Sequence, residues 1–182
     1  LLGWDVSQLG GLLLLTGARR SEITELQWSH VDFAAGTIAL PYQKGRPRRP
    51  HVVANAAMDL VSRRPRIEGA PWVFPREGDP SRCIAGEVVQ NGWARIRHAA
   101  GLDGVRLHDL RHTFGTTASR SGANAFQIRD SLRHANVTMS ARYVNADLDP
   151  QRALADTVGD ALSAALEGRQ AEVLSIGAKR RK

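Results

Sequence analysis

The sequence predicts a mainly α-helical domain with a small antiparallel β-hairpin, which is an α+β fold. Two observations indicate this: apolar residues recur at helical spacing along most of the chain, and residues 36–53 alternate apolar and polar side chains around a turn. The chain has 182 residues, of which 42% are apolar. A domain of this size buries roughly 70% of the surface that its unfolded form exposes, so we expect one hydrophobic core.

The chain opens within a helical pattern. Residues 5–17 predict a buried helix, because a run of leucines is followed by Gly17, a residue suited to ending a helix. Residues 21–33 predict a second helix, which Ser21 can cap.

A small β element is expected next. Residues 36–53 predict two strands joined around Gly45-Arg46-Pro47, a combination that favours chain reversal, with Lys44 at the tip of the hairpin. A helix is then expected over residues 55–64 and a loop, rich in proline and glycine, over residues 64–82.

The second half of the chain reads as a series of helices, with stops at Gly122 and Asn136. The expected helices cover residues 85–101, 107–122, 125–135 and 138–146. A last amphipathic helix is expected over residues 150–168, with apolar residues four apart on one face: Leu154, Val158, Leu162 and Leu166. We expect residues 1–167 to form the domain and residues 168–182 a basic, mobile tail.

Charge points to a polyanionic partner. Lys and Arg total 25 against 18 acids, and the segment from Lys44 to Arg66 holds seven basic residues and one acid, Asp59. Such clustering is typical of nucleic-acid binding, although a solvated basic face is an equally simple interpretation. No apolar run approaches the ~20 residues of a membrane helix. Cys83 is the only cysteine, so an intrachain disulfide and a cysteine-based metal cluster are excluded.

The stretch LHDLRHTF allows three interpretations. His108 and His112 lie four residues apart, which is half of a helical zinc site, but Arg111 would place a cation beside the metal and a third ligand is not evident. Alternatively, His108 and Arg111 share a helical face and bind an anion such as phosphate. In the third interpretation Arg111 pairs with an acid, either Asp109 or Asp130.

Two further basic sites are weaker signals. Arg19 and Arg20 follow the glycine turn and could point into a cleft or pair with Glu22. Lys44 could be solvated, or it could lie in a DNA groove and protonate a leaving oxygen.

Together these stretches resemble the tyrosine recombinases, the phage integrase family of site-specific DNA recombinases. The sequence TGARRSE at residues 16–22, Lys44, HDLR at 108–111, LRH at 132–134 and Tyr143 occur in the order and approximate spacing of that family. The resemblance runs from about residue 10 to residue 146, and it implies the catalytic-domain fold of these enzymes.

The resemblance implies a catalytic set of six residues: Arg19, Lys44, His108, Arg111, His134 and Tyr143. The two arginines would grip the scissile phosphate, and the histidines would help to neutralise charge in the transition state. Tyr143 would attack the phosphate to form a 3′-phosphotyrosyl ester, with His108 as its base and Lys44 as the acid for the leaving 5′-oxygen. The ester conserves the energy of the broken bond, so no metal, cofactor or ATP is implied.

The implied partner is double-stranded DNA. We expect the protein itself to be cytoplasmic and associated with the nucleoid. Five further arginines are candidate DNA contacts: Arg20, Arg46, Arg48, Arg49 and Arg133. The family also implies a tetramer on DNA that assembles through the C-terminal helix, whose apolar face could equally pack within its own chain. Two other functions stay open: a catalytically silent DNA-binding protein of the same fold, and a metal hydrolase built on His108 and His112.

The sequence departs from the family pattern in three places. Arg133 stands where glycine is common, and it could add a DNA contact or disturb the turn. Pro50 lies in the second hairpin strand, which suggests an edge or bulged position. The family's N-terminal DNA-clamping domain is not found in these residues, so we expect the chain to be part of a longer protein.

Overall fold

The computed structural model describes residues 2–41, 48–144 and 149–166. These residues belong to two compact units, Leu1–Val144 and Asn145–Lys182. The sequence-based boundary at residue 167 falls inside the second unit.

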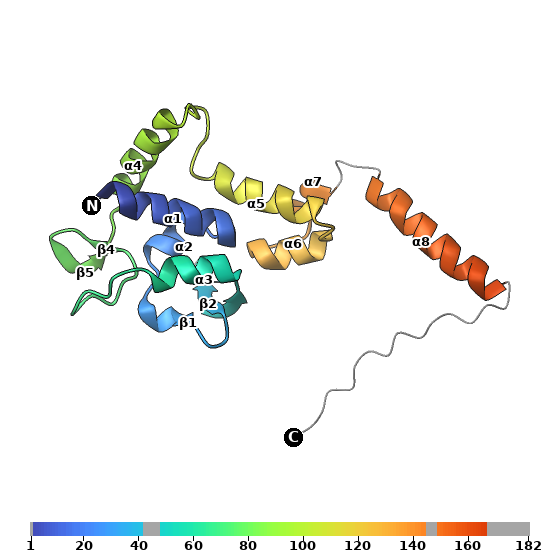
Figure 1. Ribbon diagram of the computed structural model, residues 1–182, viewed down its shortest axis with the longest axis horizontal. Helices are drawn as coiled ribbons and strands as arrows, with labels where there is room; N and C mark the ends of the chain where they lie inside the picture. Colours follow the sequence, from blue (N-terminus) through green and yellow to red (C-terminus); the bar gives the residue numbers. More distant parts are fainter. Residues whose placement is uncertain (1, 42–47, 145–148, 167–182) are drawn as a thin grey trace, which may run out of the picture. The chain divides into compact units, whose positions relative to one another are not determined.

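Helix α1 (Leu2–Thr16) lies at the centre of the first unit. It packs against α3 (Asn55–Ser62), α4 (Gly86–Ala99) and α5 (Asp109–Arg120), with α4 beside its beginning and α5 beside its end (Figure 1). Leu9, Leu12 and Leu13 of this helix enter the hydrophobic core, which also draws on the sheet and on α3. This confirms the buried helix that the leucine run predicts.

Position 17, where α1 ends, favours glycine for two physical reasons. Its φ of 59° lies in the left-handed region, which glycine adopts without a steric penalty. A Cβ at this position would also come within 2.7 Å of the Leu132 side chain and 2.8 Å of the Phe114 ring. The turn therefore brings the end of α1 into close contact with two helices from the far end of the unit.

The predicted helix over residues 21–33 is mostly wrong. Helix α2 covers only Arg20–Thr24, and it begins after Arg19 rather than Ser21. A 3-10 turn (η1, Trp28–His30) and strand β1 (Val31–Asp32) take up the remainder. Long-range pairing explains the difference: the Trp28 N–H donates to the Pro71 carbonyl at 2.9 Å, and β1 pairs with the next strand.

The predicted strands of the hairpin are confirmed as β2 (Thr37–Pro41) and β3 (Arg48–Val52), which pair antiparallel. Strand β1 adds a third member, so the sheet order is β1-β2-β3 and β3 lies at an edge. Pro50 sits opposite Ala39 on that edge, as its missing N–H led us to expect. The turn at 45–47 lies outside the described residues.

The segment predicted as a loop, residues 64–82, holds a second hairpin. Strands β4 (Pro75–Arg76) and β5 (Asp79–Cys83) pair antiparallel around Gly78, whose φ is 79°. Proline at the start of β4 obscured this hairpin in the sequence.

The helices expected in the second half are confirmed, with shifted ends. α4 and α5 are followed by α6 (Ala125–Leu132) and α7 (Thr138–Val144). Gly122 ends α5 with a φ of 86°, as expected. Helix α6, however, stops at Leu132 rather than near Asn136, because Arg133 adopts a left-handed φ of 55°.

Helix α8 (Asp149–Leu166) makes up the described part of the second unit. Val158 and Leu162, from its predicted apolar face, are 48% and 60% exposed. The basic tail at 168–182 lies outside the described residues. Within the described part of the chain, no helix is both long and apolar enough to cross a membrane.

Candidate active site

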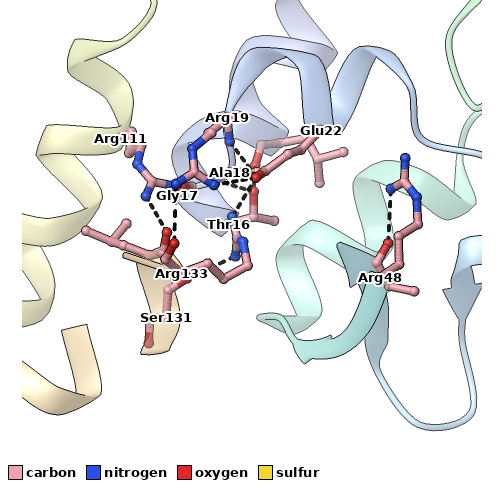
Figure 2. Close-up of polar contacts among 12 residues, drawn as sticks. Thr16, Gly17, Ala18, Arg19, Glu22, Arg48, Arg111, Ser131 and Arg133 are labelled. Atoms are coloured by element: carbon pink, nitrogen blue, oxygen red, sulfur yellow. Dashed lines mark hydrogen bonds and ion pairs between the residues drawn. The ribbon is translucent and has the colours of Figure 1, made fainter. Parts of the chain in front are cut away.

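Arg111 ties three distant segments together. It lies in the first turn of α5 and is only 5% exposed. Its guanidinium donates hydrogen bonds to the carbonyls of Gly17 and Leu132 (Figure 2). These carbonyls lie at the C-terminal ends of α1 and α6, where helices have unpaired acceptors and the negative end of their dipoles. A buried arginine provides hydrogen-bond donors for these carbonyls and a positive charge at the negative ends of the two dipoles.

Arg111 keeps its charge in this setting. Burial, followed by the positive charges of Arg19 and Arg133, lowers the pKa of Arg111 to about 10, so it is protonated at neutral pH. The interpretation that Arg111 pairs with a neighbouring acid is wrong. Asp109 pairs with Arg106 at 2.9 Å, and Asp130 pairs with Arg129 at 2.7 Å.

Glu22 holds two further arginines beside this centre. Its Oε1 lies 2.7 Å from Nη1 of Arg19, and its Oε2 lies 2.8 Å from Nη2 of Arg133 (Figure 2). Arg19 also donates from Nη2 to the Arg133 carbonyl at 3.3 Å. Burial raises the pKa of Glu22, but the Arg133 charge and the hydrogen bonds from Arg19 outweigh it, so the pKa is lowered overall.

Arg19 and Arg133 differ in what they can reach. The side chain of Arg19 is 38% exposed, so it is paired with Glu22 and still accessible. The side chain of Arg133 is 3% exposed and is held by Glu22. The expectation that Arg133 contacts DNA is therefore not supported, because its guanidinium already has an internal partner and little contact with solvent.

His134 lies directly after Arg133 and is buried. Its Nδ1 is 2.7 Å from Oγ of Ser140, on α7. Burial, followed by the charge of Arg111, lowers the pKa of His134 to about 4. At neutral pH His134 is therefore uncharged in the free protein, and it offers a hydrogen bond rather than a positive charge.

Tyr143 reaches this cluster from α7. Its ring stacks near that of His134, with centroids 6.4 Å apart and planes 12° apart. Its hydroxyl lies 2.8 Å from Nδ1 of His112, on α5. Its backbone carbonyl accepts a hydrogen bond of 2.7 Å from Oγ of Ser119. The aromatic residue expected to be a nucleophile therefore has its hydroxyl in a polar site.

The contact of His112 with Tyr143 was not predicted from the sequence, which suggested His112 only as a metal ligand. A signal was available: His112, Gly115 and Ser119 are spaced three and four apart, which places them on one face of a helix. All three contact Tyr143, because a Cβ on Gly115 would lie 2.8 Å from the tyrosine ring.

His108, which was expected to act as the base for Tyr143, lies at the N-cap of α5, where its ring is in edge contact with that of His112, with centroids 4.9 Å apart. With Arg20, Gln90 and Arg111 it lines a cavity of about 230 Å³. Burial, followed by the effect of His112 and Arg111, lowers the pKa of His108. The structure thus places His108 with the arginines, while the tyrosine hydroxyl is hydrogen-bonded to His112.

The remaining candidate DNA contacts are spread over the sheet and α2. Arg20 is exposed at the cavity just described. Arg48 donates to the Ala39 and Glu25 carbonyls at 3.3 and 3.4 Å. Arg49 is exposed on the edge strand. Lys44 and Arg46 lie outside the described residues.

The metal-hydrolase hypothesis finds no ligand set in the part of the chain that is described. No cluster of three or more His, Cys, Asp or Glu residues there could hold a metal ion. His112, one of the two ligands it requires, instead has its Nδ1 against the Tyr143 hydroxyl.

Comparison with known proteins supports the same family that the motifs resemble. The model of the phage integrase family matches residues 7–149. The tyrosine recombinase XerD of Mycobacterium leprae is 34% identical over 145 residues, which cover 72% of this chain and 45% of that protein. The chain spans about half the length of the curated relatives that it matches first.

Solved structures show the same fold. The crystal structure of XerA recombinase matches with a TM-score of 0.63 at 20% identity, over 84% of this chain and 61% of that one. The Tn1549 transposon integrase in complex with circular intermediate DNA matches with a TM-score of 0.64 at 21% identity, over 82% of this chain and 57% of that one. The expected fold, mainly α with small antiparallel sheets, is confirmed.

Proposed function

This chain belongs to the phage integrase family, and on that basis we propose that it cleaves and rejoins DNA strands through a covalent 3′-phosphotyrosyl intermediate formed on Tyr143. The observation that carries the proposal is the convergence at Arg111. One buried guanidinium on α5 donates hydrogen bonds to the carbonyls of Gly17 and Leu132, and so draws the segments of Arg19 and His134 to the helix that also contacts Tyr143.

The chemistry follows from what these groups offer an anionic phosphodiester. Arg19 is accessible and Arg111 lines a cavity, so both can donate to the non-bridging oxygens as negative charge develops on them. His108, in the same cavity, adds a donor. Losing one such donor typically lowers the rate by about 10²–10³.

The tyrosine ester preserves the bond energy of the cut strand. The Tyr143 oxygen attacks phosphorus, the bond from phosphorus to the 5′-oxygen breaks, and the 5′-oxygen takes up a proton. We retain Lys44 as the acid for that step, as the family pattern implies. A 5′-hydroxyl can later attack the ester and release Tyr143, so rejoining needs no ATP and none of these steps needs a metal.

The proposed partner is double-stranded DNA. The XerH recombinase bound to its difH substrate and the Tn1549 integrase with DNA share this fold, and the chain carries a formal net charge of +7. We propose Arg20, Arg46, Arg48 and Arg49 as phosphate contacts. We also propose that the exposed apolar residues of α8, Val158 and Leu162, support assembly into a tetramer on DNA.

Trapping the covalent intermediate tests the function. The full gene product is incubated with a pool of duplexes of random sequence, each nicked near its centre so that the short fragment released by cleavage diffuses away. Covalent protein–DNA complexes are recovered under denaturing conditions and the bound DNA is sequenced. We expect wild type to yield an enriched DNA sequence and Tyr143→Phe to yield no complex.

The same assay separates the rival functions. A silent DNA-binding protein would retard duplexes on a native gel and form no covalent complex. A metal hydrolase would cut DNA without becoming attached to it and would lose activity with a chelator. An adduct that persists in Tyr143→Phe would show that another residue is the nucleophile.

A further inference from the structure

We infer that His112, rather than His108, receives the proton of the Tyr143 hydroxyl when the tyrosine attacks. This inference rests on the proposed function, in which Tyr143 is the nucleophile. It assigns a role to a residue that neither the family motifs quoted above nor the metal interpretation explains.

The distance between His112 and Tyr143 suits proton transfer. His112 Nδ1 lies 2.8 Å from the Tyr143 hydroxyl oxygen, which is within the range for direct proton transfer along a hydrogen bond. Neutral imidazole has one nitrogen without a proton, and a phenol hydroxyl is a natural donor to it.

Tyr143 is held in place by residues of α5. Gly115 leaves room for the tyrosine ring against the helix backbone, and Ser119 holds the tyrosine carbonyl at 2.7 Å. His112, one turn earlier on the same face, then meets the hydroxyl. One helical face thus seats the ring, anchors the backbone and contacts the reacting oxygen.

His134 and His108, the other two histidines proposed for the site, have different surroundings. His134 has its Nδ1 at 2.7 Å from Ser140, and its ring lies alongside the Tyr143 ring rather than at its hydroxyl. His108 meets the edge of the His112 ring, with centroids 4.9 Å apart, and lines the cavity shared with Arg111. That position suits a phosphate donor.

The proton balance is simple. As the phenol oxygen bonds to phosphorus, its proton moves to Nδ1 of His112. The bond from phosphorus to the 5′-oxygen breaks, and that oxygen takes a proton from the acid proposed above, Lys44. In the rejoining step the 5′-hydroxyl returns this proton to Lys44 as it attacks phosphorus, and the bond to Tyr143 breaks. The departing tyrosine oxygen then takes the proton back from His112.

The contact can be tested without DNA. The chain has two tyrosines, Tyr42 and Tyr143, so Tyr42→Phe labelled with 3-fluorotyrosine gives a single ¹⁹F signal, from Tyr143. We expect His112→Leu to move that signal toward the value of free fluorotyrosine, and His98→Leu, which alters an exposed histidine on α4, to leave it in place. A signal that His112→Leu does not move would overturn the inference.

Proton transfer is tested separately with His112→Asn. The asparagine amide can still accept a hydrogen bond from the phenol, but it cannot take its proton. We expect it to hold the ¹⁹F signal near wild type and to slow adduct formation by about 10²–10⁴ on the DNA recovered above, as loss of a general base does. A rate within threefold of wild type would overturn the inference, because the contact would then only position the ring.

A substrate with sulfur in place of the leaving 5′-oxygen identifies the step. Thiols are far more acidic than alcohols, so this leaving group needs no proton. The defect of His112→Asn should persist with this substrate. Rescue by sulfur would mean that His112 serves the leaving group, and a persistent defect in His108→Asn alone would identify His108 as the base. Either result would overturn the inference, whereas absence of any adduct with wild type would refute the proposed function itself.

Discussion

Arg133 occupies a backbone position that favours glycine, and its side chain explains why a larger residue is kept there. The left-handed φ of 55° at the end of α6 carries a steric penalty of about 1–2 kcal/mol for a residue with a Cβ. The guanidinium turns inward and meets Glu22 at 2.8 Å. The buried Glu22 carboxylate is stabilised by this second arginine in addition to Arg19. The ion pair between Arg133 and Glu22 therefore offsets the steric penalty of the Arg133 backbone.

This account predicts an order of stability between two variants. Arg133→Gly and Arg133→Ala both remove the ion pair, but only the glycine variant also removes the strain at φ 55°. After allowing for the greater freedom of unfolded glycine, we expect Arg133→Gly to be more stable than Arg133→Ala by about 1 kcal/mol. Urea unfolding of the two proteins measures the difference. Equal stability would show that the turn is not strained.

Glu22 gives a prediction that depends on pH. Its pKa is lower in the folded protein than in the unfolded chain, so its contribution to stability is complete above the unfolded value of about 4.3 and is lost as pH falls through the folded pKa. We expect Glu22→Gln to lower the free energy of unfolding by about 3 kcal/mol at pH 7, since it leaves Arg133 buried without its partner. The difference in unfolding free energy between the variant and wild type should narrow below about pH 4.3.

Urea unfolding between pH 7 and pH 3 measures this effect. Glu68→Gln, which changes an exposed glutamate in the segment before β4, is the matched control and should differ little from wild type at any pH. If the difference in unfolding free energy between Glu22→Gln and wild type stayed constant with pH, the charge of the carboxylate would not contribute to the stability of the folded protein.

At the scale of the element, α5 organises the site. Its first turn supplies Arg111, which bonds to the ends of α1 and α6. Its next turns present His112, Gly115 and Ser119 to the tyrosine of α7. A single helix therefore positions both the arginine proposed to bind phosphate and the proposed nucleophile, which fixes their relative orientation more firmly than two loops would.

Gly115→Ala tests that seat. In a helix, replacing glycine by alanine normally stabilises by about 1 kcal/mol. Here the added methyl would lie 2.8 Å from the Tyr143 ring, so we expect the ring to be displaced, adduct formation to fall at least tenfold, and the gain in stability to disappear. The ¹⁹F signal of Tyr143 and the rate of adduct formation report the two effects.

Gly159→Ala is the control for Gly115→Ala. It lies in α8, and a Cβ there meets no atom within 4 Å. This variant should raise helix content and leave the Tyr143 signal unchanged. A Gly115→Ala protein with normal adduct formation would show that the ring does not use this seat during reaction.

At the scale of the molecule, the first unit contains the buried core and every described residue of the candidate site. The core residues run from Leu9 on α1 to Leu107 before α5, and the site closes with Tyr143, one residue before the unit ends. Helix α8 belongs to the second unit and exposes Val158 and Leu162. We therefore propose that folding depends on the first unit and assembly on the second.

Ending the chain after Val144 tests this division. We expect the shortened protein to unfold cooperatively with a midpoint temperature within about 2–4 °C of the full chain, because its core is retained and, for a chain of this length, a shift of that size corresponds to about 1 kcal/mol. It should lose tetramer formation on DNA, as measured by light scattering or native gel. Loss of cooperative unfolding would show that the second unit is needed for the first to fold.

Sequence patterns by themselves determined the fold class, most of the helices, the two strands around residues 42–47, and the family. These features depend on local periodicity, on glycine and proline signals, and on the order of short motifs, all of which are written along the chain. The predicted helix over 21–33 failed because Trp28 and Val31 form backbone pairs with Pro71 and Ile38, and no local pattern records such pairs.

Only the tertiary structure decided which groups meet. Arg133 looked like a surface contact until the end of α6 was placed against Glu22, and His112 looked like half of a metal site until α7 was placed against α5. Both assignments depend on contacts between residues that are far apart in the sequence. The separation is 31 positions for His112 and Tyr143, and 111 positions for Glu22 and Arg133. The physical reason is that burial, ion pairing and hydrogen-bond distance are properties of packed helices, and a side chain's chemistry depends on the neighbours that packing gives it.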